Sequence, residues 1–125
     1  METARLTETK LDVLGTEYTI KETAYQDDQW FEENDCDGYT NALTKEIVLC
    51  EFPTHPYHMG TTEAEYAMLR KEILRHEIIH AFLNESGLRC CAGNAECWPQ
   101  NEEMVDWIAL QGPKICAAWK KADAM

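Results

Sequence analysis

The sequence contains no apolar run approaching the roughly 20 residues that a membrane-spanning helix needs. It also lacks internal repeats, low-complexity tracts and long linkers. Residues 1–10 are polar and acidic and contain no apolar segment of the kind found in signal peptides. We therefore expect a cytoplasmic protein with neither a signal peptide nor a membrane anchor.

Basic residues are scarce, with 11 Lys and Arg against 23 Asp and Glu, which gives a net charge of -12. Because phosphate contacts need clustered Lys and Arg, we expect no nucleic-acid partner. The acidity favours solubility, and attraction of basic substrates is the alternative interpretation.

A length of 125 residues and a hydrophobic share of 45% predict one globular domain over residues 1–125, with residues 1–10 loosely ordered. Short apolar and β-branched segments at 11–23 and 47–50 predict a strand or hairpin and a further strand. Gly15-Thr16 is turn material in the first of these. Residues 25–35 fit a short helix or a loop, and residues 53–60 fit a loop.

Helical patterns occupy the second half of the chain. Thr62 and Glu65 form a capping-box pattern that predicts a long helix to about residue 84, followed by Gly87 as a C-terminal cap. Asn101 is expected to cap a last helix to about residue 119, which Pro113 would kink or divide. Strands grouped before helices predict an α+β fold.

The aromatic and cysteine residues are mostly assigned to packing. We expect the tryptophans and neighbouring apolar residues of the C-terminal part to be core or helix-packing residues, namely Trp98, Trp107, Ile108 and Trp119. Trp30-Phe31 is predicted to lie in the core, with a surface anchor as the alternative, and Cys50 and Cys116 are predicted to be buried.

Three cysteines cluster at Cys90, Cys91 and Cys97. They could form a disulfide or part of a second zinc site with His55 and His58. Their spacing does not match a C-x-x-C knuckle, so reduced loop cysteines are the preferred interpretation.

The segment His76-Glu77-Ile78-Ile79-His80 carries the clearest chemical signal. Two histidines four residues apart lie on one face of a helix, where both imidazoles can reach one zinc ion at about 2.0–2.1 Å. The adjacent Glu77 can reach a water on the open side of the metal and act as a general base. Two histidines on an amphipathic helix, without a metal, are the alternative.

A catalytic zinc site needs a third protein ligand. A metzincin would need Gly and His where this chain has Leu83 and Ser86, so that class is excluded. We favour Glu102 as the third ligand, with Asp106 one turn later supporting a histidine, and Glu103 is the alternative ligand. Ordinary first-turn acidic residues, stabilised by the helix dipole, would give the same pattern.

These segments resemble known zinc peptidases. The motif at 76–80 followed by N-E-x-x-x-D at 101–106 is similar to the thermolysin-like gluzincin pattern, in which that Glu is the third ligand and that Asp supports a histidine. The chain also resembles ImmA/IrrE-type peptidases, with Val105 and Ile108 replacing the Ala and Phe of their helix motif. It most resembles small predicted metallopeptidases of bacteriophages and prophages, at residues 76–88 and 101–109.

The resemblance implies a minimal zincin-like fold, with a small, mostly antiparallel sheet packed on the active-site helix and a C-terminal helix. Its cleft-lining edge strand would be residues 47–50. It implies peptide-bond hydrolysis with one Zn²⁺ per chain and a protein or peptide substrate. Candidates for stabilising the oxyanion, which gluzincins do with Tyr or His, are Tyr39, Tyr57 and His58. The alternative function is a non-catalytic zinc-binding regulatory or phage-morphogenesis protein, for which virion association is an option.

Overall fold

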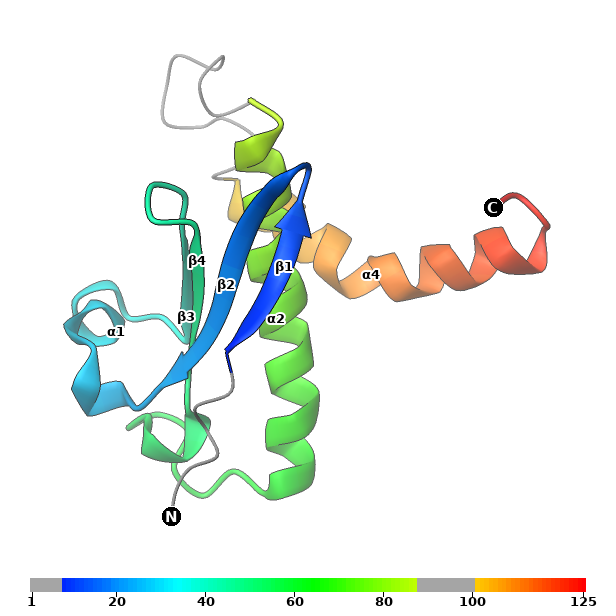
Figure 1. Ribbon diagram of the computed structural model, residues 1–125. Coiled ribbons are helices and arrows are strands. Elements are labelled where there is room, and N and C mark those ends of the chain that lie inside the picture. Colours follow the sequence, from blue (N-terminus) through cyan, green and yellow to red (C-terminus); the bar gives the residue numbers. More distant parts are fainter. Residues whose placement is uncertain (1–7, 88–100) are drawn as a thin grey trace.

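The computed structural model describes residues 8–87 and 101–125, which form an α+β structure as predicted (Figure 1). The strands are β1 (Thr9–Val13), β2 (Thr16–Thr23), β3 (Gly38–Asn41) and β4 (Glu46–Cys50). The helices are α1 (Gln29–Asn34), α2 (Glu63–Glu85) and α4 (Glu102–Lys121), and short 3-10 helices are η2 (Tyr25–Asp27) and η3 (Phe52–Thr54). Within the described ranges, no helix is long and apolar enough to cross a membrane.

The four strands form one sheet in the order β1-β2-β4-β3. β1 and β2 form the predicted hairpin, which turns through Leu14 and Gly15, both with positive φ. β3 pairs antiparallel with β4, whereas β2 and β4 are parallel, so the sheet is mixed, with two antiparallel pairings and one parallel pairing where a mostly antiparallel sheet was expected. The prediction of a strand at residues 47–50 is confirmed, but its expected position at the edge is wrong. The edge strand on that side of the sheet is β3.

β4 is central because its side chains are buried on both faces of the sheet. Ile47 and Leu49 belong to the core cluster between the sheet and α2. Val48 and Cys50 pack with Phe31 of α1 in a second cluster on the other side. Figure 1 shows α1 and α2 on opposite sides of the sheet. The apolar run of β4 therefore holds two layers together, as a strand buried on both faces does.

Local capping sets the limits of α2. The Thr62 hydroxyl oxygen accepts a hydrogen bond from the Glu65 backbone N–H, and the Thr62 backbone N–H donates in return to the Glu65 carboxylate, which confirms the capping box. At the other end, Gly87 adopts a φ of 91°, a left-handed conformation that favours glycine, and its N–H bonds the Asn84 carbonyl. α2 buries Ala81 against the sheet, with Ile73, Leu74 and Ile78 around it.

α4 begins at the predicted cap, where the Asn101 side chain accepts from the Met104 backbone at 2.8 Å. The beginning of α4 lies against α2, where Val105 and Ala109 are buried. Arg75 of α2 donates to the Ala109 carbonyl at 2.8 Å. Together these contacts fix the start of α4 beside the middle of α2.

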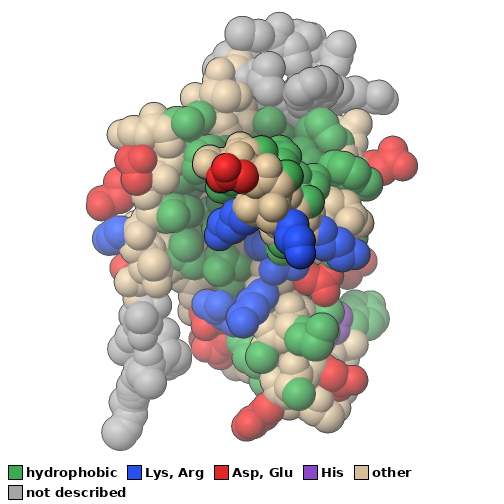
Figure 2. Space-filling model, turned by 90° about the vertical axis from the view of Figure 1, so that its right-hand side faces the viewer, with side chains coloured by type: hydrophobic (Ala, Val, Ile, Leu, Met, Phe, Trp, Pro, Cys, Tyr) green, Lys and Arg blue, Asp and Glu red, His purple; other side chains and the backbone are tan. Residues whose placement is uncertain are grey.

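The second half of α4 departs from expectation. The helix is not divided at Pro113 and continues to Lys121. It projects away from the sheet (Figure 1), and the view from that side shows apolar side chains on the surface beside Lys and Arg (Figure 2). Trp107 and Trp119 are 58% and 50% exposed, and Cys116 is exposed, so their predicted burial is wrong.

These exposures have simple causes. Trp107 lies on the face of α4 opposite Val105 and Ala109, and Cys116 and Trp119 lie beyond the contact with α2.

Near the N-terminus of α1, Phe31 is buried as predicted, whereas Trp30 is 48% exposed. Cys50 is buried, which confirms that prediction.

Candidate metal centre

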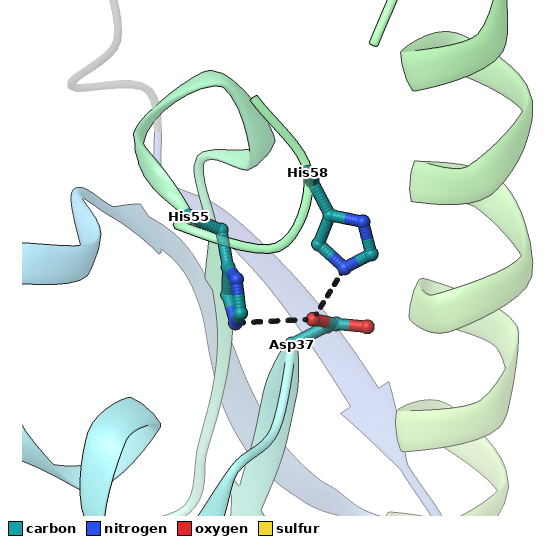
Figure 3. Close-up of side chains that lie close together, drawn as sticks. All are labelled: Asp37, His55 and His58. Carbon is teal, nitrogen blue, oxygen red and sulfur yellow. Dashed lines mark hydrogen bonds and ion pairs between the residues drawn. The ribbon is translucent and has the colours of Figure 1, made fainter. Parts of the chain in front are cut away.

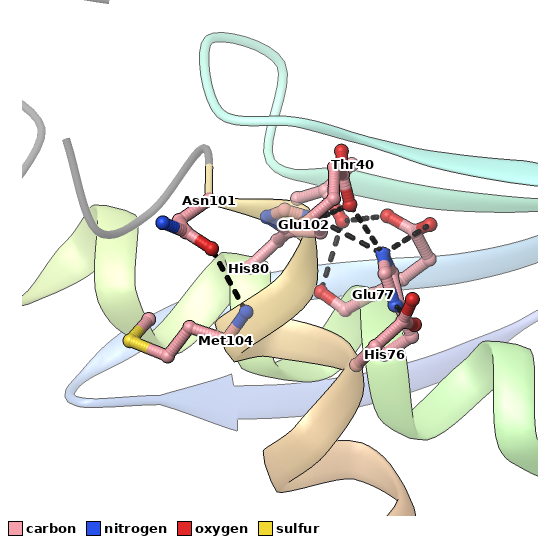
Figure 4. A network of polar contacts seen from close by, with 8 residues as sticks. Thr40, His76, Glu77, His80, Asn101, Glu102 and Met104 are labelled. Atoms are coloured by element: carbon pink, nitrogen blue, oxygen red, sulfur yellow. Dashed lines mark hydrogen bonds and ion pairs between the residues drawn. The ribbon is translucent and has the colours of Figure 1, made fainter. Parts of the chain in front are cut away.

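Three donor atoms converge between α2 and α4 (Figure 4). The Nε2 atoms of His76 and His80 lie 3.1 Å apart, because the two residues are one turn apart on the same face of α2. Glu102, the first residue of α4, places Oε1 2.9 Å from His76 Nε2 and 3.2 Å from His80 Nε2. The predicted residues are thus brought together in a group that could hold a metal ion.

Asp106 sets the orientation of the His76 ring through the nitrogen that faces away from the candidate ligands, Nδ1. Asp106 Oδ1 lies 2.6 Å from His76 Nδ1, one turn beyond Glu102 on α4. A carboxylate only accepts, so Nδ1 carries the proton that it donates to Asp106. In the neutral ring, Nε2 then presents a lone pair to the carboxylate of Glu102. Two acceptors at 2.9 Å repel each other unless a proton or a cation lies between them.

A divalent metal ion fits this arrangement. Ligand atoms at about 2.0–2.1 Å from a tetrahedral ion lie about 3.3 Å from one another. The three observed separations, 2.9, 3.1 and 3.2 Å, are close to that value. The histidine side chains are 18% and 12% exposed, whereas that of Glu102 is 69% exposed. The group is therefore anchored in the protein on the α2 side and open to solvent on the α4 side.

Glu77 lies beside this group and is only 7% exposed. Thr40 of β3 donates its hydroxyl to Glu77 Oε1 at 2.8 Å and lies 2.9 Å from the Glu77 carbonyl oxygen. The other carboxylate oxygen, Oε2, is 4.0 Å from His76 Nε2. Burial raises the pKa of Glu77, and the hydrogen bond from Thr40 opposes this shift. One oxygen is therefore held by β3 while the other faces the histidines.

Sequence analysis missed Thr40. Its role depends on β3 lying at the sheet edge beside α2, a pairing that no local pattern indicates. Gly38 makes this approach possible, because a Cβ there would lie 3.1 Å from the Leu49 side chain and 3.2 Å from the Ile73 side chain. The alternation of β3 alone could have suggested that Gly38 and Thr40 share one face.

Two hollows adjoin the group. The larger, of about 560 Å³, is lined by His76, Glu77, Glu102 and Asp106 and by residues 34–38 that lead into β3. The other, of about 450 Å³, is lined by residues that include Tyr39, Thr40 and His80. Because Glu77 and Glu102 line both, the candidate ligands lie where the two hollows meet.

The three oxyanion candidates are not equivalent. Tyr39 lines the smaller hollow, but its hydroxyl donates to Asp28 at 2.5 Å, and burial together with this bond raises its pKa. Tyr57 is 78% exposed. His58 pairs with Asp37 at 2.9 Å. Neither Tyr57 nor His58 lines the two hollows.

Two other acidic residues lie outside the group. Glu103, the alternative third ligand, is exposed and is not a member. Glu85, at the end of α2, is directed away from the group and accepts from Tyr18 at 2.6 Å and from Lys45 at 2.8 Å. The predictions for Cys90, Cys91, Cys97 and Trp98 fall outside the described residues.

Comparisons with known protein families, with curated proteins and with solved structures find no match for this chain.

Proposed function

We propose that this protein is a small zinc-dependent metallopeptidase with a zincin-like arrangement of helix, edge strand and third ligand. The observation that carries the proposal is the convergence of His76 Nε2, His80 Nε2 and Glu102 Oε1 within 3.2 Å of one another, with the Glu77 carboxylate adjacent. Two imidazoles and one carboxylate form a donor set typical of catalytic zinc, in which a fourth position stays open.

Zinc held by these residues would supply Lewis acidity that activates a water molecule and polarises the scissile carbonyl. Glu77 would take the proton of the attacking water at Oε2 and pass it to the leaving amine nitrogen. Thr40 would hold Oε1, so that the carboxylate keeps its other oxygen directed at the reacting atoms. Asp106 would keep His76 in the tautomer that leaves Nε2 available.

The substrate class proposed is a protein or peptide. The candidate ligands lie at the junction of two solvent-open hollows, so a chain segment can approach them from either side. The edge strand β3 borders this junction through Gly38 and Thr40.

A non-catalytic zinc-binding role is the second candidate. The observation that favours it is the burial of Glu77 and its hydrogen bond to Thr40, which also suit a purely structural carboxylate. In that case zinc removal would unfold the domain, as in structural zinc sites, while the Glu77→Gln variant would keep the function of the wild type.

The test compares the wild type with Glu77→Gln, which preserves the size of the side chain and removes its ability to accept the water proton. Both proteins are analysed for bound zinc and incubated with a peptide library derived from a bacterial proteome. We expect equal zinc content and new peptide termini with the wild type alone. Equal zinc content with no cleavage by either protein, or with the same cleavage by both, would contradict the catalytic proposal.

A further inference from the structure

A second group of metal-ligating side chains lies away from the centre described above (Figure 3). Asp37 directly precedes β3, and His55 and His58 belong to the loop that follows η3. Asp37 Oδ1 is 2.9 Å from His58 Nε2 and 3.4 Å from His55 Nε2. All three donor atoms lie within 4.8 Å of one another.

His55 is the unusual member of this group because it is only 2% exposed. Its ring packs against Tyr25, with ring centroids 4.7 Å apart, and against His58 at 4.8 Å. Its Nε2 is buried and makes no hydrogen bond within the described residues, and Asp37 Oδ1 lies 3.4 Å from it. A buried polar atom without a hydrogen bond destabilises a fold unless something else binds it.

We propose that Asp37, His55 and His58 form a second binding site for a divalent transition-metal ion, of the zinc type. Two imidazole nitrogens and one carboxylate oxygen suit such ions better than Mg²⁺ or Ca²⁺, which prefer oxygen ligands. The ion would satisfy His55 Nε2. The side chains of Asp37 and His58 are 34% and 28% exposed, so an ion and its water ligand can enter from solvent.

Binding at this site requires one hydrogen bond to change. The Tyr57 backbone N–H donates to His55 Nδ1 at 3.2 Å, which in the neutral ring places the proton on Nε2. An ion at Nε2 needs the other tautomer, with the proton on Nδ1, so the Tyr57 N–H must turn to water. Tyr57 is 78% exposed, so its backbone N–H can exchange this bond for one to water.

Such an ion would stabilise one wall of the larger hollow beside His76 and Glu77. Asp37 lines the same hollow as His76 and Glu77, whereas His55 and His58 do not. The ion would therefore join the loop after η3 to the start of β3, next to Gly38. We assign it a structural role at this wall, separate from the chemistry at His76 and His80.

The experiment measures the number of zinc ions bound per chain in the intact protein, with equilibrium dialysis and metal analysis. Asp37→Asn removes a ligand with almost no change of side-chain size, whereas His58→Ala also removes a ring that stacks on the buried Phe52, so each variant is checked for folding by circular dichroism. Asp35→Asn is the matched control, because Asp35 is exposed, lies two residues away and has a left-handed backbone that Asn tolerates. Each protein is also titrated with Co²⁺ and its absorption spectrum recorded.

We expect the wild type and Asp35→Asn to bind one more ion than Asp37→Asn and His58→Ala. The Co²⁺ ion that the wild type binds and these two variants do not should contribute visible ligand-field bands to the wild-type spectrum. It should not contribute the near-ultraviolet thiolate band that cysteine ligands produce. A His76→Ala/His80→Ala variant should still bind the ion at Asp37. The proposal would be overturned if the wild type, Asp37→Asn and His58→Ala bound the same number of ions. Thiolate absorption from the extra ion of the wild type would also overturn it.

Discussion

The two histidine clusters differ in the backbone that holds them and in the partner of the far ring nitrogen. His76 and His80 lie on a regular helix, and His76 Nδ1 donates to the carboxylate of Asp106. His55 and His58 lie on a loop, and His55 Nδ1 accepts from a backbone N–H. In the first cluster, Asp106 accepts the hydrogen bond that His76 Nδ1 donates and leaves Nε2 with a lone pair for a metal. In the second cluster, the Tyr57 N–H occupies the lone pair of His55 Nδ1, so the proton of the neutral ring is on Nε2.

In both clusters, the partner of Nδ1 determines whether Nε2 is unprotonated and therefore able to bind a metal. The cluster on α2 and α4 is already in the required tautomer at His76, whereas the loop cluster must exchange a hydrogen bond. We therefore expect zinc to fill the site at His76 and His80 before it fills the site at Asp37. A stepwise titration that filled the loop site first would reverse the comparison.

The largest effect is expected from His80→Ala. This change removes one of two imidazoles and leaves a site with too few protein ligands to retain zinc, so the tighter binding step should disappear. The weaker step, assigned to Asp37, should remain. Isothermal titration of the metal-free protein with zinc checks both expectations, and retention of the tight step would exclude His80 as a ligand.

Asp106→Ala should weaken the tighter site by about 10–100-fold, the usual cost of losing a carboxylate behind a ligating histidine. Glu103→Ala is the control, since Glu103 is an exposed acid in the same helical turn. Competition with a chromophoric chelator measures both affinities. If the two variants weaken binding equally, the effect of Asp106 is general electrostatics rather than orientation of His76.

Gly38→Ala tests the segment between the clusters. A methyl group there would lie within 3.2 Å of the Leu49 and Ile73 side chains, so we expect a loss of about 1–3 kcal/mol in the free energy of unfolding from overpacking. Gly112→Ala is the control, because nothing lies within 4 Å of a Cβ at that position. Urea denaturation measures both, and a Gly38→Ala protein as stable as the wild type would show that β3 can move away from α2.

Thr40→Val should have the smallest effect, about a tenfold loss of kcat. One hydrogen bond to a charged group is worth about 1.5–3 kcal/mol, part of which water can replace. Zinc affinity should not change, because the Thr40 hydroxyl donates to Glu77, which is not one of the three candidate ligands. Thr40→Ser keeps the hydroxyl and should restore activity. Loss of zinc binding in Thr40→Val would show that Thr40 supports the fold instead.

Sequence patterns predict the first cluster well because its geometry is local. A spacing of four on a capped helix fixes His76 and His80, and a capped second helix fixes the separation of Glu102 from Asp106. What remained open was how α4 lies against α2, which depends on Val105, Ala109 and Arg75 in three dimensions.

The second cluster and Thr40 could not be predicted in the same way. Asp37 meets His55 and His58 only because the loop after η3 returns to the start of β3. The central position of β4 and the edge position of β3 depend on a parallel pairing between β2 and β4 that no local signal encodes. The exposure of Trp107, Cys116 and Trp119 likewise depends on where α4 leaves the rest of the protein.

The most direct measurement is a crystal structure of the zinc-loaded protein with data collected on both sides of the zinc absorption edge. We expect the strongest anomalous peak between His76 Nε2, His80 Nε2 and Glu102 Oε1, with the Glu77 carboxylate beside it and not bound to it. A zinc-saturated crystal without a peak at that position, or with Glu77 as a ligand in place of Glu102, would contradict the metal centre on which the proposed function depends.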